Sequence, residues 1–197
     1  MLIEHRGSTP VVAASAVVAP TAVISGDVTL GENVRVLHGA VLSAEDGLIT
    51  VGDDVVIMEG ALLRGRARHH VVVGSSVMIG PRAHVNGAEI GDGAFIATGA
   101  SVFPGAVVGA GAEVRINAVV QVNTTLEPGA VVPIGWVAVG SPASILPPER
   151  HDEIWAIQRE LGFVATVYGA APDATMSDIM RGQAEFYGAH RDDRLLE

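Results

Sequence analysis

The fold is decided by residues 51–91, which read VGDDVVIMEGALLRGRARHHVVVGSSVMIGPRAHVNGAEIG. Branched apolar residues occupy every sixth position of this stretch, in two runs separated by a short insertion. The runs are Val51, Ile57, Leu63 and Val73, Ile79, Val85. A period of six fits neither an α-helix nor a simple alternating strand. A fixed short repeat of this kind indicates a solenoid.

The same period continues outward from this stretch, from Val12 to about Pro142. Small residues such as Ala61 and Ala83 stand four positions after most of the branched ones. Three hexapeptides can then form one triangular coil, with the branched residue inside and the small residue at a tight corner. Coils would stack at roughly 4.8 Å, so that each buries the core of the next. We therefore predict an all-β solenoid, a parallel β-helix of hexapeptide repeats.

The repeat ends at Ser141-Pro142 and Pro147-Pro148, because proline cannot donate to a strand ladder. Beyond it, residues 151–164 have apolar side chains at helical spacing, and residues 177–187 predict a second helix capped by Ser177. The prediction is a β-helix domain over residues 1–146 and a C-terminal helical appendage over 147–197, laid back along the solenoid.

Four segments outside the repeat have predictions of their own. The two interruptions, 43–50 and 65–72, are expected to be loops between coils. Residues 1–10 are expected to form a polar lead, and the charged end, 189–197, is expected to fray. The second loop carries Arg66 and Arg68, and Arg64 directly precedes it; this basic run is the only obvious attractor for phosphate on this chain.

Composition excludes several classes of function. The chain has 197 residues and no cysteine, so it has no disulfide and no thiolate site. Its formal net charge of −10 argues against nucleic acid or an anionic membrane as a partner. No apolar run reaches transmembrane length. The segment Val11–Ala19 is in phase with the hexads, so we interpret it as the first coil rather than a signal peptide and expect a cytoplasmic protein.

The hexapeptide pattern resembles the hexapeptide-transferase superfamily, which implies a left-handed β-helix. The positions of the insertions and the later helix resemble one group in it, the γ-class carbonic anhydrase family. That family's stretches RGD, NIQDGSVIH and IGHGAILHGC correspond here to residues 43–45 (SAE), 56–64 (VIMEGALLR) and 79–88 (IGPRAHVNGA). The resemblance covers roughly residues 11–165.

The zinc chemistry of that family does not carry over. Three histidines bind the metal in the family, and their positions here hold Arg64, Pro81 and Asn86. Arginine and proline cannot ligate zinc, and an asparagine amide is a poor ligand. Without zinc nothing lowers the pKa of a bound water towards 7. The sequence thus predicts no carbonic anhydrase activity, no metal and no cofactor, with the pair His69-His70 left open as a relocated metal site.

Strand alternation places a set of polar residues where the family has its metal. Ser43, Arg64 and Asn86 should form one outward column, with His84 beside Asn86, while Glu59 and His38 occupy a neighbouring corner. A guanidinium in such a set can anchor an anion, and an imidazole can move a proton near neutral pH. The candidate binding residues are Arg64, Asn86, Ser43 and His38, and the candidate catalytic residues are His84 and Glu59.

Three functions follow from these residues. The first is a metal-free γ-carbonic-anhydrase-like homotrimer that binds or transforms a small carboxylate or thioester at the subunit interface. The second is a hexapeptide-type acyltransferase that uses an acyl-CoA, with His84 as the base. The third is a non-catalytic scaffold or binding trimer. The trimer is implied by the resemblance and by outward apolar residues such as Leu62, Phe95, Phe103 and Val119, since apolar patches mark interfaces.

Overall fold

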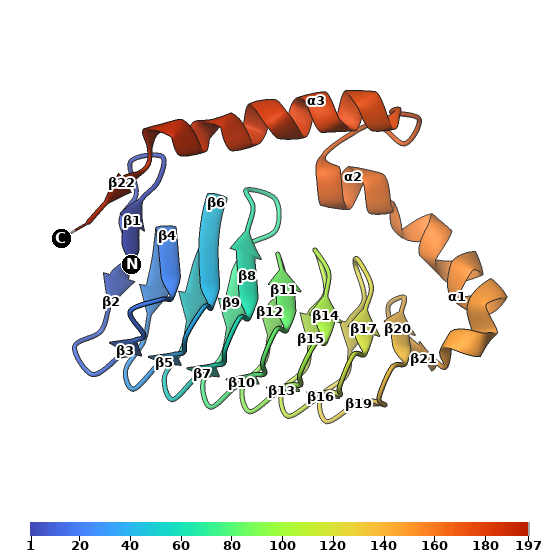
Figure 1. Ribbon diagram of the computed structural model, residues 1–197. Helices are drawn as coiled ribbons and strands as arrows, with labels where there is room; N and C mark the ends of the chain where they lie inside the picture. Colours follow the sequence, from blue (N-terminus) through green and yellow to red (C-terminus); the bar gives the residue numbers. More distant parts are fainter. Residues whose placement is uncertain (197) are drawn as a thin grey trace.

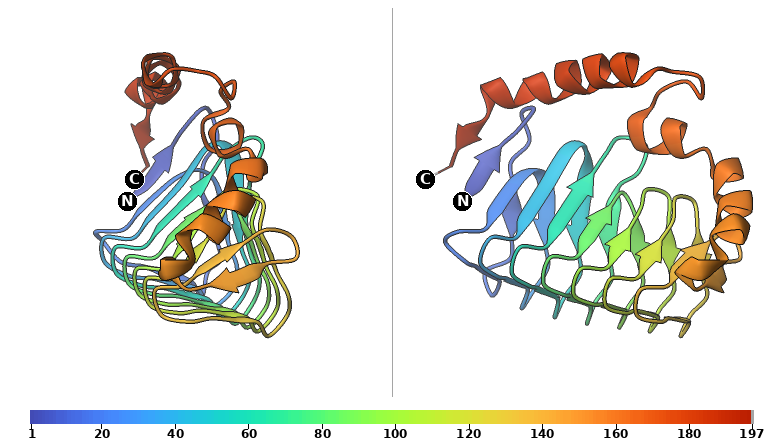
Figure 2. Two further views of the ribbon diagram at one scale, coloured as in Figure 1. Left: turned by 90° about the vertical axis from the view of Figure 1, so that its right-hand side faces the viewer. Right: turned by 45° about the vertical axis from the view of Figure 1, so that its right-hand side comes forward.

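The chain is a left-handed parallel β-helix of hexapeptide repeats, followed by helices that turn back along it (Figure 1). This description comes from a computed structural model and covers residues 1–196. Seen along the axis, the coils have a triangular outline (Figure 2, left). The predicted fold class is therefore confirmed.

The three faces of the triangle are parallel sheets. The first contains β4 (Val23–Leu30), β6 (Val41–Val51), β8 (Leu62–Gly65), β11 (His84–Asn86), β14 (Ser101–Val102), β17 (Val119–Val120) and β20 (Val137–Val139). The second contains β2 (Val11–Val12), the later parts of β4 and β6, β9 (Val71–Val73), β12 (Glu89–Ile90), β15 (Val107–Val108) and β18 (Thr125–Leu126). The third contains β3 (Val17–Val18), β5 (Arg35–Val36), β7 (Val56–Ile57), β10 (Met78–Ile79), β13 (Phe95–Ile96), β16 (Glu113–Val114) and β19 (Val131–Val132).

The branched residues of the hexads form ladders inside the triangle. On the first face Leu42 pairs with Leu63, and Leu63 pairs with Val85 on the next coil. All three side chains have 0% exposure. Each coil thus shields the apolar edge of its neighbour, which is the stabilising contact in a stacked repeat.

The predicted loop at residues 43–50 is wrong, because β6 continues through it as one strand from Val41 to Val51. One side of this strand pairs with β4, and the other pairs first with β8 and then with β9. The extra residues therefore extend the sheet around a corner instead of leaving it. At 65–72 the loop is a tight turn, in which Arg66 and His69 exchange backbone hydrogen bonds of 2.9 and 3.0 Å.

The two ends of the described chain also differ from prediction. Residues 1–10 contain β1 (Leu2–Glu4), which pairs in parallel with β4. The segment expected to fray contains β22 (Arg194–Leu195), which pairs antiparallel with β1. Free backbone groups on the edge of β4 bind β1, and β1 in turn binds β22. Apolar Leu2 and Ile3 were too few to predict a strand from pattern alone.

The C-terminal part begins after β21 (Ser144–Leu146), which folds back antiparallel on β20. Its helices are η1 (Pro148–Arg150), α1 (His151–Gln158), η2 (Arg159–Leu161), α2 (Phe163–Tyr168), α3 (Met176–Tyr187) and η3 (Gly188–Asp192). The predicted helix over 151–164 is interrupted at Gly162, whose φ is +67°, a backbone conformation that glycine adopts readily. In α1, Ile154 packs on Val139 and Leu146 and closes the last coil.

The longest helix, α3, runs back over the solenoid from α2 towards the first coils (Figures 1 and 2). Thr175, rather than Ser177, caps it: the Thr175 side chain accepts a hydrogen bond from the Asp178 backbone N–H, and the Asp178 side chain accepts one from Thr175 N–H. This reciprocal capping box satisfies two amides that a helix start otherwise leaves open. None of the helices in residues 1–196 has the length and apolarity needed to cross a membrane.

Candidate functional site

The polar column predicted from strand alternation is present. Ser43 pairs in register with Arg64, and Arg64 pairs with Asn86. His84 lies on the same strand as Asn86, two residues earlier. The parallel register of the coils thus brings together four of the six predicted site residues.

The column is covered by the chain's own C-terminal part. The guanidinium carbon of Arg64 lies 5.8 Å from the ring centre of Tyr187, at the end of α3. The ring of His84 lies 6.3 Å from that of Phe103, which in turn contacts Phe163 of α2 at 6.0 Å. Phe103 was predicted to face a neighbouring subunit, but α2 of the same chain packs against it.

Three polar atoms under this cover have no hydrogen-bond partner among the described residues. They are Arg64 Nε, His84 Nε2 and Asn86 Oδ1. A buried donor or acceptor without a partner costs about 1–3 kcal/mol. Burial and then the charge of Arg64 lower the pKa of His84, so its imidazole is neutral near pH 7. The column therefore presents a cationic donor, an amide acceptor and a neutral imidazole.

Glu59 and His38 lie elsewhere. Both side chains are exposed at the turn that leads from the third face to the first. The Nδ1 atom of His38 is 2.8 Å from the hydroxyl of Thr21, and Glu59 makes no hydrogen bond or ion pair through its side chain within residues 1–196. Within a single chain neither Glu59 nor His38 lies at the column, so the catalytic role of Glu59 and the binding role of His38 remain predictions.

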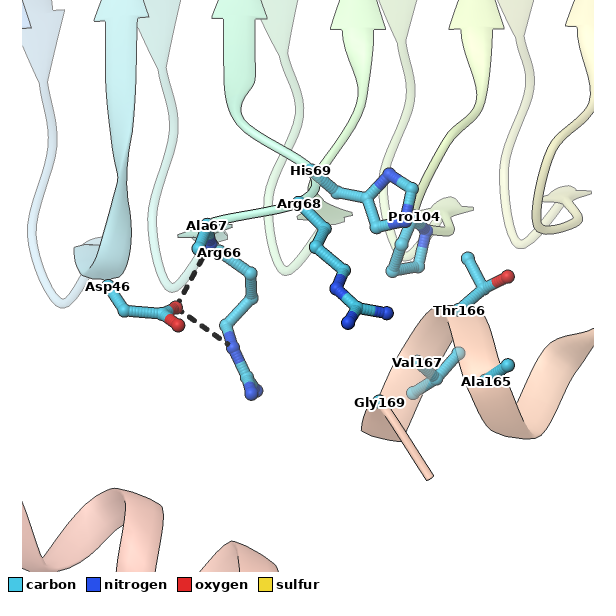
Figure 3. Close-up of a pocket in the computed structure, with 10 residues that line it drawn as sticks. All are labelled: Asp46, Arg66, Ala67, Arg68, His69, Pro104, Ala165, Thr166, Val167 and Gly169. Atoms are coloured by element: carbon cyan, nitrogen blue, oxygen red, sulfur yellow. Dashed lines mark hydrogen bonds and ion pairs between the residues drawn. The ribbon is translucent and has the colours of Figure 1, made fainter. Parts of the chain in front are cut away.

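An open cavity of about 180 Å³ lies next to the column, between the basic turn and α2 (Figure 3). It is lined by Asp46, Arg66, Ala67, Arg68, His69, Pro104, Ala165, Thr166, Val167 and Gly169. Asn123 fixes α2 against the solenoid, because its amide donates to Leu161 O at 2.9 Å and to Thr166 Oγ1 at 3.1 Å. The cavity therefore has one wall from the β-helix and one from the helical part.

Asp46 holds the basic turn in place. Its Oδ1 atom accepts a hydrogen bond from the Ala67 backbone N–H at 3.0 Å and lies 3.3 Å from Arg66 Nε. Gly47 permits this approach, since a Cβ atom there would lie only 2.3 Å from Arg66 O. The side chain of Arg66 also stacks on Phe186 of α3, at 3.8 Å from the ring centre. Arg66 is thus occupied in holding the structure together.

Arg68 and His69 are the two groups that remain available in the cavity. Arg68 is exposed, extends towards α2 (Figure 3), and makes no ion pair with any residue from 1 to 196. His69 is half-buried. A Cβ atom at Gly87 would lie 2.5 Å from that of His69, so the turn packs directly on the residue after Asn86. A second cavity of about 190 Å³ shares both residues and continues along the second face.

The pKa of His69 is lowered by burial first, and then by the positive charges of Arg68 and His70. Its imidazole therefore carries a free lone pair at neutral pH, as a general base requires. The sequence identified this turn as a phosphate attractor but not His69 as a base. The basic run of Arg66 and Arg68 was visible in the sequence. Nothing in the sequence indicated that α2 would form the opposite wall of the cavity.

One family model matches part of the chain. Residues 70–104 match the family described as bacterial transferase hexapeptide (six repeats). These residues include His70, all of β9 to β14 and Pro104. No curated protein matches the sequence.

Three similar solved structures carry related descriptions. A hexapeptide transferase family protein from Anaplasma phagocytophilum is 22% identical, with 96% of this chain and 93% of that chain covered and a TM-score of 0.45. A putative acetyltransferase from Bacillus cereus is 19% identical, with 93% and 95% covered and a TM-score of 0.45. Perosamine N-acetyltransferase from Caulobacter crescentus, in complex with CoA and GDP-perosamine, is 27% identical, with 66% and 55% covered and a TM-score of 0.43.

Proposed function

We propose that the protein is an acyltransferase that takes its acyl group from an acyl-CoA. The observation that carries this proposal is the cavity at Arg68 and His69, a cationic site beside residues 70–104, the segment that matches the transferase family. An arginine without an ion-pair partner suits the phosphates of CoA. A neutral imidazole beside it suits the removal of a proton from the acyl acceptor.

In the proposed reaction the acyl group moves from the CoA sulfur to the acceptor, and one proton moves the other way. His69 takes a proton from the amine or hydroxyl of the acceptor, whose electron pair attacks the thioester carbonyl. The carbon–sulfur bond then breaks, the CoA thiolate leaves, and the proton passes to that sulfur. The resting pKa of His69 favours the first step, because an imidazole that is already protonated cannot accept a proton.

The cavities of one chain hold only part of such a donor. At about 180 and 190 Å³, each is below the roughly 300–1,000 Å³ that small-molecule sites usually have. A neighbouring subunit would supply the remaining wall, as the predicted homotrimer implies. Exposed apolar residues support such an assembly: Met78 lies in β10 on the third face, and Ile116 and Ile134 lie in the turns after β16 and β19.

Arg68→Ala should weaken the binding of CoA about 10- to 100-fold, because a hydrogen bond to a charged group contributes about 1.5–3 kcal/mol. The binding of pantetheine, which has no phosphate, should change little. Isothermal titration of both compounds to the wild-type protein and the variant measures this difference.

Arg181→Ala is the matched control, since Arg181 is an exposed arginine on α3 whose side chain is 77% accessible. It should leave CoA binding unchanged. Equal losses for CoA and pantetheine in R68A, or no CoA binding to the wild-type protein at millimolar concentration, would contradict the proposal.

The polar column supports a second candidate function, which is the binding or conversion of a small carboxylate. Its three buried atoms without partners can be satisfied by a ligand: Arg64 Nε donates to a carboxylate, while Asn86 Oδ1 accepts from a hydroxyl. This is the metal-free γ-carbonic-anhydrase-like function inferred from the sequence, and it needs no metal at Arg64, Pro81 or Asn86. A protein that binds neither CoA nor a carboxylate would fit the non-catalytic scaffold.

Arg64→Ala should weaken the binding of such an anion by about 1.5–3 kcal/mol. Thermal-shift titration with acetate, lactate and succinate, followed by calorimetry on the best of them, tests this expectation. Arg35→Ala, which removes an arginine from the third face, is the control and should keep the wild-type affinity. If none of the three anions stabilises the wild-type protein, the column is not a carboxylate site.

A further inference from the structure

A second polar cluster lies where the two ends of the described chain meet, and the proposed acyl transfer does not use it. It combines His5, which follows β1, Glu45 within β6, and His190 within η3. One ligand atom from each residue lies within 4.8 Å of the others. Asp193 and Ser43 complete the cluster. Its members come from segments up to 188 positions apart, which only the docking of α3 and β22 brings together.

The two imidazoles are held in the same orientation by one carboxylate. Asp193 Oδ1 lies 2.6 Å from His5 Nδ1, and Asp193 Oδ2 lies 2.9 Å from His190 Nδ1. Each Nδ1–H therefore donates to Asp193, and both Nε2 atoms face Glu45. Without a metal, His190 Nε2–H donates to Glu45 Oε2 at 3.1 Å, whereas His5 Nε2 has no hydrogen-bond partner among residues 1–196. A carboxylate behind a histidine in this way is the usual support of a metal-binding imidazole.

Glu45 is oriented in the same manner. The hydroxyl of Ser43 donates to Glu45 Oε1 at 2.8 Å, so that Oε2 faces the two histidines. The side chain of Glu45 is only 4% exposed. A buried carboxylate is costly unless it is paired, and the groups that face Glu45 are the imidazoles of His5 and His190 rather than a lysine or arginine.

The distances fit a metal ion between these atoms. Glu45 Oε2 lies 3.1 Å from His190 Nε2 and 3.9 Å from His5 Nε2. In a tetrahedral zinc site, bonds of about 2.0–2.2 Å place a nitrogen and an oxygen ligand roughly 3.3 Å apart. The two observed separations lie on either side of that value.

His5 Nε2 points most directly to a missing partner. The residue is 1% exposed, and Nε2 has no hydrogen-bond partner within residues 1–196. At 3.9 Å, Glu45 Oε2 is too far away for a hydrogen bond. A proton on this nitrogen would have no acceptor in reach, whereas a metal ion would be bonded to both atoms.

We propose that His5 Nε2, His190 Nε2 and Glu45 Oε2 bind a divalent transition-metal ion, with zinc as the best fit. Two imidazoles and one carboxylate suit zinc and exclude magnesium and calcium, which require oxygen ligands. The ion's two charges balance Glu45 and Asp193. His190 is partly exposed, so a fourth position can hold water. This site shares no ligand with the three histidine positions of the γ-class family or with His69-His70.

Zinc titration of the EDTA-treated wild-type protein, with a chromophoric chelator as competitor, tests the proposal. One equivalent should bind per chain, and Co²⁺ in its place should show the visible absorption of a four-coordinate site. His5→Ala, His190→Ala and Glu45→Gln should each weaken zinc binding at least 100-fold. Asp193→Asn should weaken it about 10- to 100-fold, as expected for a residue that positions the ligands.

Matched controls separate this site from the other histidines. His151→Ala should leave zinc affinity unchanged, as should the double substitution His69→Ala, His70→Ala. Failure of the wild-type protein to bind zinc at micromolar concentration would overturn the proposal whether or not the variants fold, and so would loss of binding in the double variant. Zinc should also slow hydrogen exchange in η3 and β22. All these measurements are independent of CoA binding and acyl transfer.

Discussion

Replacing His69 with alanine should lower the rate of acyl transfer by about 10²- to 10⁴-fold, the usual contribution of a general base. The loss should appear in kcat more than in the binding of CoA, because a proton-transfer role acts in the transition state. The release of free CoA thiol from an acyl-CoA, with a panel of amine and hydroxyl acceptors, measures this rate. The parallel variant is His84→Ala. If H84A abolishes turnover and H69A does not, the base is the histidine predicted from the sequence.

The dependence of the acyl-transfer rate on pH distinguishes a general base at His69 from a residue with only a structural role. Burial and the charges of Arg68 and His70 lower the pKa of His69 below its ordinary value of 6.5. The rate should therefore be at its plateau at pH 7 and should fall only below that value. Arg68→Ala removes one cation that opposes protonation, so the acidic limb of the profile should move upward, towards 6.5. A shift of this acidic limb to lower pH in the R68A variant would contradict the assignment of His69 as the base.

Leu63→Ala should reduce the free energy of unfolding by about 2–5 kcal/mol, the range for removing a fully buried leucine side chain. Leu63 has 0% exposure, and it lies between Leu42 and Val85 in a ladder that continues through the coils. The cavity left by the substitution would be closed in above and below by neighbouring coils. Urea denaturation followed by circular dichroism measures the change.

Val11→Ala is the comparison for this substitution. Val11 lies in β2, next to the inward-facing Val12 of the hexad series, but its own side chain points outward and is 61% exposed. Its truncation should change the stability by less than about 0.5 kcal/mol, as for most surface positions. Equal effects of L63A and V11A would mean that the ladder does not carry the stability of the solenoid.

The sequence predicted the fold and the register because both depend on a local period. Val85 points inward for the same reason as Leu63, so Arg64 and Asn86 could be placed in one column without coordinates. Glu45 is the contrasting case. Its segment is polar and was interpreted as a loop, yet the residue is buried in β6. Its partners His5 and His190 are 40 residues before it and 145 residues after it, and no local pattern connects them.

The cavity was missed for a similar reason. The basic run at Arg66 and Arg68 was visible in the sequence, but its opposite wall is α2, whose position depends on the break at Gly162 and on the hydrogen bonds from Asn123. The cover over the column depends on where Tyr187 arrives after α3 has crossed the solenoid. A helical period predicts that a helix exists and which of its sides is apolar. It does not predict which part of the molecule the helix reaches.

The pairing of β22 with β1 changes how the solenoid opens. In a stack of repeats each coil contacts only its neighbours, so the terminal coils normally fray independently. Here β1 lies on β4 in the first coils, α1 closes the last coil, and α3 joins the two regions. Detaching β1 from β4 disturbs β22 as well, and with it the anchor of α3. Local opening at the first coil is therefore coupled to undocking of the whole helical part, which makes the two ends of a quasi-one-dimensional array one cooperative unit.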